Sequence, residues 1–159
     1  MAKKAKKNED CIIEIKNRKA SFLYKVVEQF EAGISLQGSE IKSIRQGKAN
    51  LNDAYCTFKG DELYVISLYI AEYEHGGHYN HKPRRDRKLL LKRHELKKLQ
   101  KKVKEKGFTI VPFRLFINLR GFAKLDIALV QGKRSVDKSK SIKERDIARD
   151  MDRQLKRYR

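Results

Sequence analysis

The strongest constraint on the fold is a pair of long segments in which apolar and polar residues alternate. The segments FTIVPFRLFINL (108–119) and FAKLDIALV (122–130) are separated only by Arg120 and Gly121. In the second segment, one face of an extended strand carries the apolar residues Leu125, Ile127 and Leu129. A period of two is typical of half-buried strands, so we predict a long antiparallel hairpin, with an edge or a bulge at Pro112.

Shorter runs rich in β-branched and aromatic residues predict further strands at 11–15, 34–37, 55–58, 63–70 and 89–91. The sequence KGDE joins the third and fourth of these runs, which predicts a second hairpin. Cys11 and Cys56 each lie inside a strand-like run. We therefore expect buried thiols rather than a disulfide or metal ligands.

Helical spacing marks three other segments. In SFLYKVVEQFEAG, which Gly33 ends, one helical face carries Phe22, Leu23, Val26, Val27 and Phe30. Ser39 can cap a short helix that turns Ile41 and Ile44 inward and ends at Gly47. A basic helix follows the run at 89–91 and ends at Gly107.

Together these elements predict a mainly β protein with about six mostly antiparallel strands and three helices. A small closed or nearly closed barrel of the oligonucleotide-binding type suits this set of elements. The chain is long enough for one core, and we expect a basic N-terminus at 1–8, one domain at 9–131 and a basic tail at 132–159.

The charge indicates the partner class. The formal net charge is +19, and the tail carries +6 of it, which leaves about +13 for the rest of the chain. Such a field favours nucleic acid. It fits a membrane less well because no segment approaches the ~18 apolar residues of a span. The start, MAKKAKK, is followed by no apolar stretch of a secretory signal, so we expect a cytoplasmic protein.

The tail has a pattern of its own. Ser141 and Glu144 have the spacing of a capping box, which predicts a helix at about 142–157. One ridge of that helix carries Arg145, Arg149, Arg153 and Arg157, and the opposite ridge carries Ile147, Met151 and Leu155. Because like charges four residues apart repel, we expect a helix that forms when phosphates bind it. The alternative is a solvated basic tail.

The segment EHGGHYNHKPRRDRK (74–88) has no core pattern of its own and predicts a loop. Its four cations within five residues, Arg84, Arg85, Arg87 and Lys88, suit phosphate contacts. His75, His78 and His81 lie nearby with Glu74, but no fourth ligand has a definite spacing and the glycines predict a flexible loop. We therefore predict no metal and no cofactor. No catalytic motif is present, so we do not expect an enzyme.

Three runs carry a resemblance that extends over nearly the whole chain: FEAGISLQGSEIKSIRQGKANL (30–51), HYNHKPRRDRKLLLKRHEL (78–96) and GKRSVDKSKSIKERD (132–146). They closely resemble the family of SsrA-binding proteins, also called small protein B. The resemblance implies a barrel of the oligonucleotide-binding type without enzymatic activity. It further implies binding to the tRNA-like domain of transfer-messenger RNA, which the protein accompanies to stalled bacterial ribosomes. Elongation factor Tu on the aminoacylated RNA is an implied partner, and we expect a monomer.

The resemblance also implies an RNA surface made by Glu31, Gly47, Lys48, Ala49, Asn50, Leu90 and Lys124. Two of these residues have a structural alternative. Glu31 has the position of a helix-end carboxylate, and Leu90 has the position of a core residue between Leu89 and Leu91.

For the tail, the resemblance implies entry into the empty mRNA channel and the decoding centre, against 16S rRNA. The residues concerned are Lys133, Arg134, Asp137, Lys138, Lys143, Arg145, Arg149, Arg153 and Leu155. Some family members carry a ring beside the Asp-Lys pair, whereas this chain has Val136. A permanent ribosomal protein with the same fold is the alternative function, and a metal-dependent nuclease would need the histidine loop.

Overall fold

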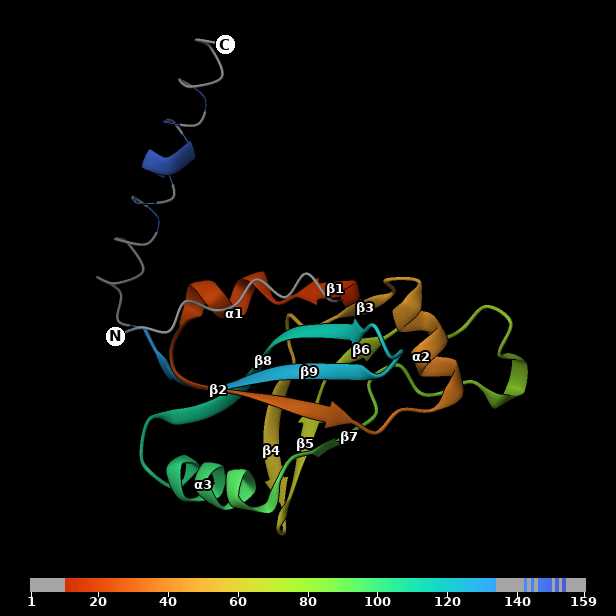
Figure 1. Cartoon of the computed structure of the whole chain (residues 1–159), viewed down its shortest axis with the longest axis horizontal. Helices are drawn as coiled ribbons and strands as arrows, with labels where there is room; N and C mark the ends of the chain where they lie inside the picture. The colour runs from red at the N-terminus through yellow and green to blue at the C-terminus, as the bar shows by residue number, and fades with distance from the viewer. Residues whose placement is uncertain are drawn as a thin grey trace.

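The computed structural model describes residues 11–133 and, in the tail, residues 142, 144, 146–149, 151 and 153. Figure 1 shows the order of the elements. The strands are β1 (Cys11–Lys16), β2 (Tyr24–Ile34), β3 (Ala49–Asn50), β4 (Tyr55–Lys59), β5 (Glu62–Ile66), β6 (Tyr69–Ile70), β7 (Arg87–Leu90), β8 (Phe108–Asn118) and β9 (Ala123–Gly132). The helices between them are α1 (Arg18–Leu23), α2 (Gly38–Arg45), the 3₁₀ turn η1 (Gly77–Tyr79) and α3 (Arg93–Val103).

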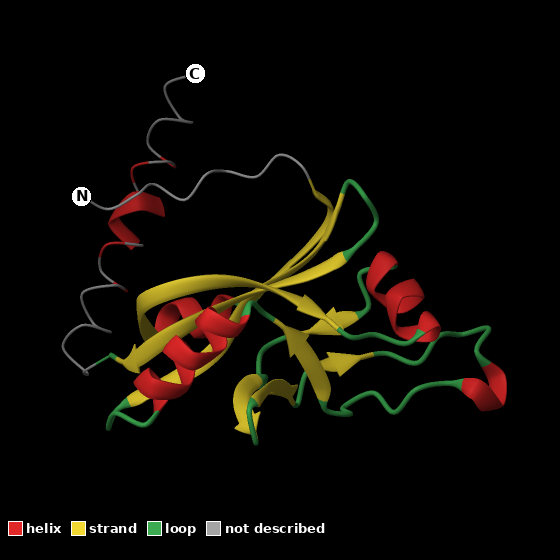
Figure 2. Cartoon of the chain, turned by 60° about the horizontal axis from the view of Figure 1, so that its bottom comes forward, coloured by secondary structure: helices red, strands yellow, loops and turns green. Residues whose placement is uncertain are grey.

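The described fold is mainly β with a few helices. Seven strands form one antiparallel sheet in the order β1-β8-β4-β5-β7-β2-β9, and β8 pairs with β9 as well. The pairings therefore return from β9 to β8 and form a closed circuit of six strands. The strands β4 and β5 lie at a steep angle to β8, β9 and β2 (Figure 1). Figure 2 shows how strongly the long strands curve. A separate pair, β3 and β6, is also antiparallel.

The main core lies on the side of the sheet that the circuit of strands encloses. It contains Leu115, Leu125, Ile127 and Leu129 of the β8–β9 hairpin, all of them fully buried. A smaller cluster forms where α1 covers the other side of the hairpin, with Ala20, Val111, Ala128 and Val130. The stretch of β9 from Ile127 to Val130 is thus buried on both sides. Lys124 and Asp126, in its first half, are partly exposed, as the alternation predicts.

Several predictions from the sequence are confirmed. The β8–β9 and β4–β5 hairpins form, and the register of β8 shifts between Pro112 and Arg114, which is the predicted bulge. The basic helix forms as α3. Cys56 is buried, and burial raises the pKa of its thiol, so the thiol stays protonated. The side chain of Cys11 lies outside the described residues.

The second helix forms with a different start. Gln37, rather than Ser39, is the N-cap of α2, and Glu40 completes the capping box by accepting a hydrogen bond from the Gln37 backbone N–H at 2.7 Å. The predicted end is confirmed, because Gly47 follows the helix with φ = 72°, a conformation that favours glycine. Ile44 is fully buried, and Lys42 and Arg45 point outward.

The prediction of one helix over SFLYKVVEQFEAG is wrong. Only Arg18–Leu23 are helical, and β2 begins at Tyr24 and continues past Gly33, so of the residues predicted as a strand at 34–37 only Ile34 belongs to one. The reason is tertiary: β2 pairs with β9 from Tyr24 opposite Gly132 to Gly33 opposite Lys124. Val26 and Val27 have β-branched side chains that suit a strand, and both are exposed.

Candidate nucleic-acid interface

Three neighbouring strands place three of the predicted RNA residues, Glu31, Leu90 and Lys124, in one row. Gly33 of β2 lies between Leu90 of β7 and Lys124 of β9, since it is the register partner of both. Glu31, two residues earlier in β2, forms an ion pair with Lys124 at 3.6 Å. An apolar side chain, a cation and a carboxylate therefore share one surface. In the chain, Leu90 comes 59 residues after Glu31, and Lys124 comes another 34 residues later. We call this set of four residues the β7–β2–β9 row.

The row is open to solvent. Leu90 is 55% exposed, so it is not a core residue. Glu31 is also exposed, and it lies on a strand rather than at the end of a helix. Gly33 leaves room for Leu90, because a Cβ atom at Gly33 would lie 3.2 Å from the Leu90 Cβ and would press Leu90 out of its present position. A large apolar side chain is thus held in solvent beside charged groups, an arrangement that suits a ligand with both an apolar face and polar edges.

The segment Gly47–Asn50 follows α2 and is held by its neighbours. Lys48 forms an ion pair with Glu74, and its carbonyl accepts a hydrogen bond from the Ala71 N–H at 2.9 Å. Ala49 and Asn50 form β3. The preceding Arg45 reaches the β8–β9 turn, where its guanidinium lies beside Gly121. That turn leads into β9, the strand of Lys124, so Arg45 links the end of α2 to the β8–β9 turn.

The four cations predicted to bind phosphates have different surroundings. Arg84 is exposed, and its guanidinium lies 5.7 Å from the centre of the Tyr69 ring. Lys88 is partly exposed and forms an ion pair with Glu62. Arg87 and Lys88 belong to β7 rather than to the predicted loop.

Arg87 departs most from the expectation of a phosphate contact. Its side chain is fully buried, and it donates to Glu40 Oε1 at 2.8 Å and to the Leu68 carbonyl at 2.6 Å. Arg85 donates to both carboxylate oxygens of Glu40, at 2.7 and 2.6 Å. The physical reason is the buried carboxylate of Glu40, which needs opposite charge within the low-dielectric interior. Arg87 is therefore a structural residue in this conformation.

The ionisation of this buried group follows from its partners. Burial alone raises the pKa of the Glu40 carboxyl, but the hydrogen bonds from Arg85 and the Gln37 N–H and the charge of Arg87 outweigh it. The pKa of Glu40 is consequently lowered, and the group is a carboxylate at neutral pH. Sequence reasoning missed this cluster. No local pattern connects its members, because the two arginines lie 45 and 47 residues from Glu40 in the chain.

The histidine loop does not form a ligand cluster. His81 is buried. Its Nδ1 lies 2.9 Å from the Ser39 hydroxyl oxygen, and its Nε2 lies 3.1 Å from the Ile70 carbonyl oxygen. Because a carbonyl only accepts, Nε2 carries the hydrogen. His75 stacks edge-on against Tyr73. Within the part of the chain that the structure describes, no group of three or more His, Cys, Asp and Glu is arranged to hold a metal.

Only part of the predicted tail site is described. Lys133 is tied to α1, since its N–H donates to the Leu23 carbonyl at 3.1 Å and its Nζ to the Ser21 carbonyl at 3.2 Å. Arg149 and Arg153 are helical, within the helix predicted at about 142–157, and Ile147 and Met151 are 60% exposed. Outside the described residues lie Arg134, Val136, Asp137, Lys138, Lys143, Arg145 and Leu155.

Among the described helices, none combines the length and the apolar composition that a membrane crossing needs.

Comparison with known proteins gives the family. The sequence profile of the SmpB protein family matches residues 14–157. The chain is 55% identical over 145 residues to the SsrA-binding protein of Phocaeicola vulgatus, covering 91% of this chain and 97% of that protein. It is 45% identical over 159 residues to the SsrA-binding protein of Trichodesmium erythraeum, covering 99% and 100% of the two chains.

A solved structure agrees with this result. It is described as "tmRNA-SmpB: a journey to the center of the bacterial ribosome" and superposes with a TM-score of 0.66 at 46% identity, covering 77% of this chain and 85% of the other. The profile match over most of the chain and these relatives lead to one conclusion: the chain belongs to the SmpB protein family, the SsrA-binding proteins.

Proposed function

We propose that this protein binds the tRNA-like domain of transfer-messenger RNA and brings that RNA to stalled ribosomes for trans-translation. Relatives that cover nearly its whole length carry the name SsrA-binding protein, and the solved neighbour is described as tmRNA-SmpB in the bacterial ribosome. This function makes the protein an RNA-binding partner rather than an enzyme, and it acts where ribosomes act, in the cytoplasm.

The observation that carries the proposal is the β7–β2–β9 row. Exposed Leu90 offers an apolar surface on which an unstacked base can pack, and Lys124 offers a cation for a phosphate. The carboxylate of Glu31 accepts hydrogen bonds from base amino groups or ribose hydroxyls. Each of the three components of RNA thus has a matching group on one surface.

The scaffold supports this use. The circuit β8-β4-β5-β7-β2-β9 has the connectivity of a small closed sheet, which we interpret as a barrel of the oligonucleotide-binding type. Backbone pairing of β7, β2 and β9 holds the row, and we expect the segment Gly47–Asn50 and exposed Arg84 to extend the RNA surface. Arg85 and Lys88 are partly exposed, but each is paired with a carboxylate, which offsets its charge.

The tail serves the second partner. We propose that residues 132–159 enter the empty mRNA channel and contact 16S rRNA at the decoding centre, with a helix that phosphates stabilise. The exposed ridge of Ile147 and Met151 provides the apolar contact. We further propose that elongation factor Tu joins the complex through the aminoacylated transfer-messenger RNA. The protein would act as a monomer in both contacts.

The most direct experiment is to identify the RNA that copurifies with the native protein. One dominant tRNA-like species supports the proposal, whereas stoichiometric recovery with all ribosomes would indicate a permanent ribosomal component instead.

A matched pair of variants then tests the site. Lys124→Ala should weaken binding to the tRNA-like domain while the thermal midpoint stays nearly unchanged, because the Lys124–Glu31 pair lies on the surface. Lys101→Ala, an exposed lysine of α3, removes the same charge away from the row and should bind as the wild type does. Equal affinities for the two variants at low and moderate salt would remove Lys124 from the site.

A further inference from the structure

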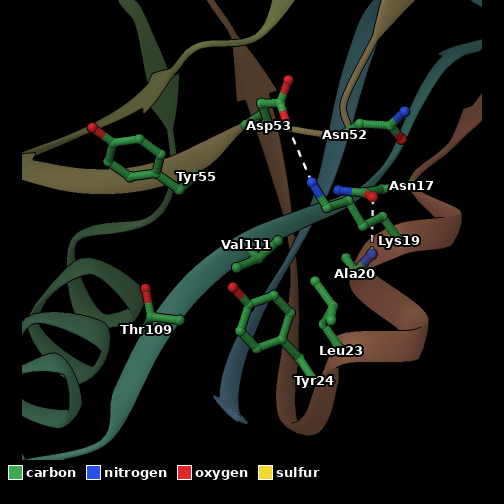
Figure 3. A pocket seen from close by; sticks show the side chains of 11 residues that line it. Asn17, Lys19, Ala20, Leu23, Tyr24, Asn52, Asp53, Tyr55, Thr109 and Val111 are labelled. Atoms are coloured by element: carbon green, nitrogen blue, oxygen red, sulfur yellow. Dashed lines mark hydrogen bonds and ion pairs between the residues drawn. The ribbon is translucent and has the colours of Figure 1, made fainter. Parts of the chain in front are cut away.

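A hollow lies at the other end of β2 from the β7–β2–β9 row. It has a volume of about 410 Å³ and is enclosed by α1, the turn before β4 and the first half of β8. Figure 3 shows Tyr24 and Tyr55 among the side chains around it, with Val111 between them. We propose that this hollow is a second RNA subsite, which takes one unstacked base of a single-stranded segment.

The hollow has walls that are built before any ligand arrives. Asn17 is buried and acts as the N-cap of α1, accepting a hydrogen bond from the Ala20 N–H at 3.0 Å. Its Nδ2 donates to the Leu51 carbonyl at 2.9 Å and to the Pro112 carbonyl at 3.0 Å. One side chain thus ties together the helix, the turn before β4 and β8, so that a ligand need not order them.

The chemistry of the hollow suits a neutral, flat group. Ala20, Ala54 and Val111 are buried apolar residues in its lining. Tyr55, at its rim, is 47% exposed, which leaves part of an aromatic ring open to solvent. Aromatic rings are the usual partners of bases that leave the stack. The volume is within the ~300–1,000 Å³ of small-ligand sites, so one nucleoside fits.

The charges of the lining exclude a bare phosphate as the main ligand. Lys19 forms an ion pair with Asp53 at 3.3 Å, so the two formal charges in this lining cancel (Figure 3). The exposed amide of Asn52 offers both donors and an acceptor, which match the polar edge of a base. The hollow is therefore locally neutral, whereas the whole chain has a net charge of +19 and attracts RNA to its surface.

The position of the hollow indicates which partner would fill it. Tyr24 and Gly33 are the two ends of the β2–β9 pairing, nine residues apart, or roughly 30 Å along an extended strand. Lys133, where the basic tail begins, is hydrogen-bonded to Ser21 and Leu23 of α1, and Leu23 lines the hollow. The hollow therefore lies at the base of the tail. Its RNA is the one that the tail contacts, and this last step rests on the proposed function.

The test uses the full chain with isotope-labelled methyl groups and two probes of equal length: a short single-stranded oligoadenosine and an abasic oligoribonucleotide. The methyl signals of Ala54 and Val111 should shift with the oligoadenosine and stay in place with the abasic chain. Tyr55→Ala should weaken this response by about 5- to 150-fold, the range of one lost base–aromatic stack, and Tyr55→Phe should retain it.

Tyr79→Ala is the control for a lost tyrosine, because Tyr79 is 95% exposed in η1, and it should respond as the wild type does. The proposal is overturned if the abasic chain shifts Ala54 and Val111 equally, if only signals near Leu90 shift, or if Tyr55→Ala responds normally. Binding of the same variants to the tRNA-like domain separates the two ideas. If the wild-type protein does not bind the tRNA-like domain, the proposed function is refuted, and the oligoadenosine result is unaffected.

Discussion

Replacing Glu40 by alanine tests the buried cluster that joins α2 to the segment before β7. The Glu40 side chain is fully buried and bonded to two arginines, of which Arg87 is also fully buried. Burial lowers the pKa of the Arg87 guanidinium, and the charge of Glu40 only partly offsets this. The Glu40→Ala variant therefore keeps a buried cation whose compensating charge has gone.

The size of the effect follows from this geometry. Removing one partner of a buried ion pair typically costs about 3–5 kcal/mol. The loss also leaves the Gln37 N–H without its capping carboxylate. Since domains of this size are stable by only about 5–15 kcal/mol, Glu40→Ala should remove a large part of the stability of the protein.

Urea unfolding followed by circular dichroism measures this loss. Glu62→Ala is the matched control, because Glu62 also pairs with a cation of β7, Lys88, but on the exposed surface. We expect a nearly unchanged urea midpoint for Glu62→Ala and a much lower one for Glu40→Ala. Equal midpoints for the two variants would refute the view that the Glu40 cluster is buried and charged.

The pH dependence gives an independent check on the charge of Glu40. The pKa of Glu40 is lowered in the folded protein from its ordinary value of 4.5, so its ionised form favours folding. The stability advantage of the wild type over Glu40→Gln should therefore be complete above about pH 4.5 and shrink as the pH falls through the folded pKa. An advantage that grows on acidification would contradict the assignment.

Three further predictions concern the RNA surfaces. Gly33→Ala should displace Leu90, because the new Cβ would lie 3.2 Å from the Leu90 Cβ, and so lower the affinity for the tRNA-like domain while the variant still folds; unchanged affinity would exclude Leu90 from the contact. If exposed Arg84 meets one phosphate, Arg84→Ala should flatten the slope of log affinity against log salt by roughly 0.7–0.9, and an unchanged slope would argue against that contact. A chain that ends at Gln131 should fold and bind transfer-messenger RNA but fail in a tagging assay on ribosomes stalled without a codon. Normal tagging would contradict the separate role of the tail.

The sequence by itself predicted those features that depend on residues close to one another in the chain. The alternation in β8 and β9 predicts their hairpin because a period of two exposes one face of a strand, and the strand partner follows after a short turn. The end of α2 at Gly47 and the bulge near Pro112 follow from the backbone limits of glycine and proline. The resemblance to a family supplied the predicted RNA residues, which spacing alone does not connect.

Tertiary structure decided the features that depend on distant partners. Tyr24–Ile34 has helical spacing in its apolar residues, yet it is a strand because β9 offers it a full ladder of backbone partners. Arg84 and Arg87 look alike in the sequence. Arg84 stays at the surface, whereas Arg87 is drawn into the interior by Glu40, which lies 47 residues earlier. The hollow beside Tyr55 likewise exists only because Asn17 joins segments 34 and 95 residues away. A charged or polar side chain is fixed by whichever partner the fold brings within hydrogen-bonding distance, and that partner is not encoded in the local pattern.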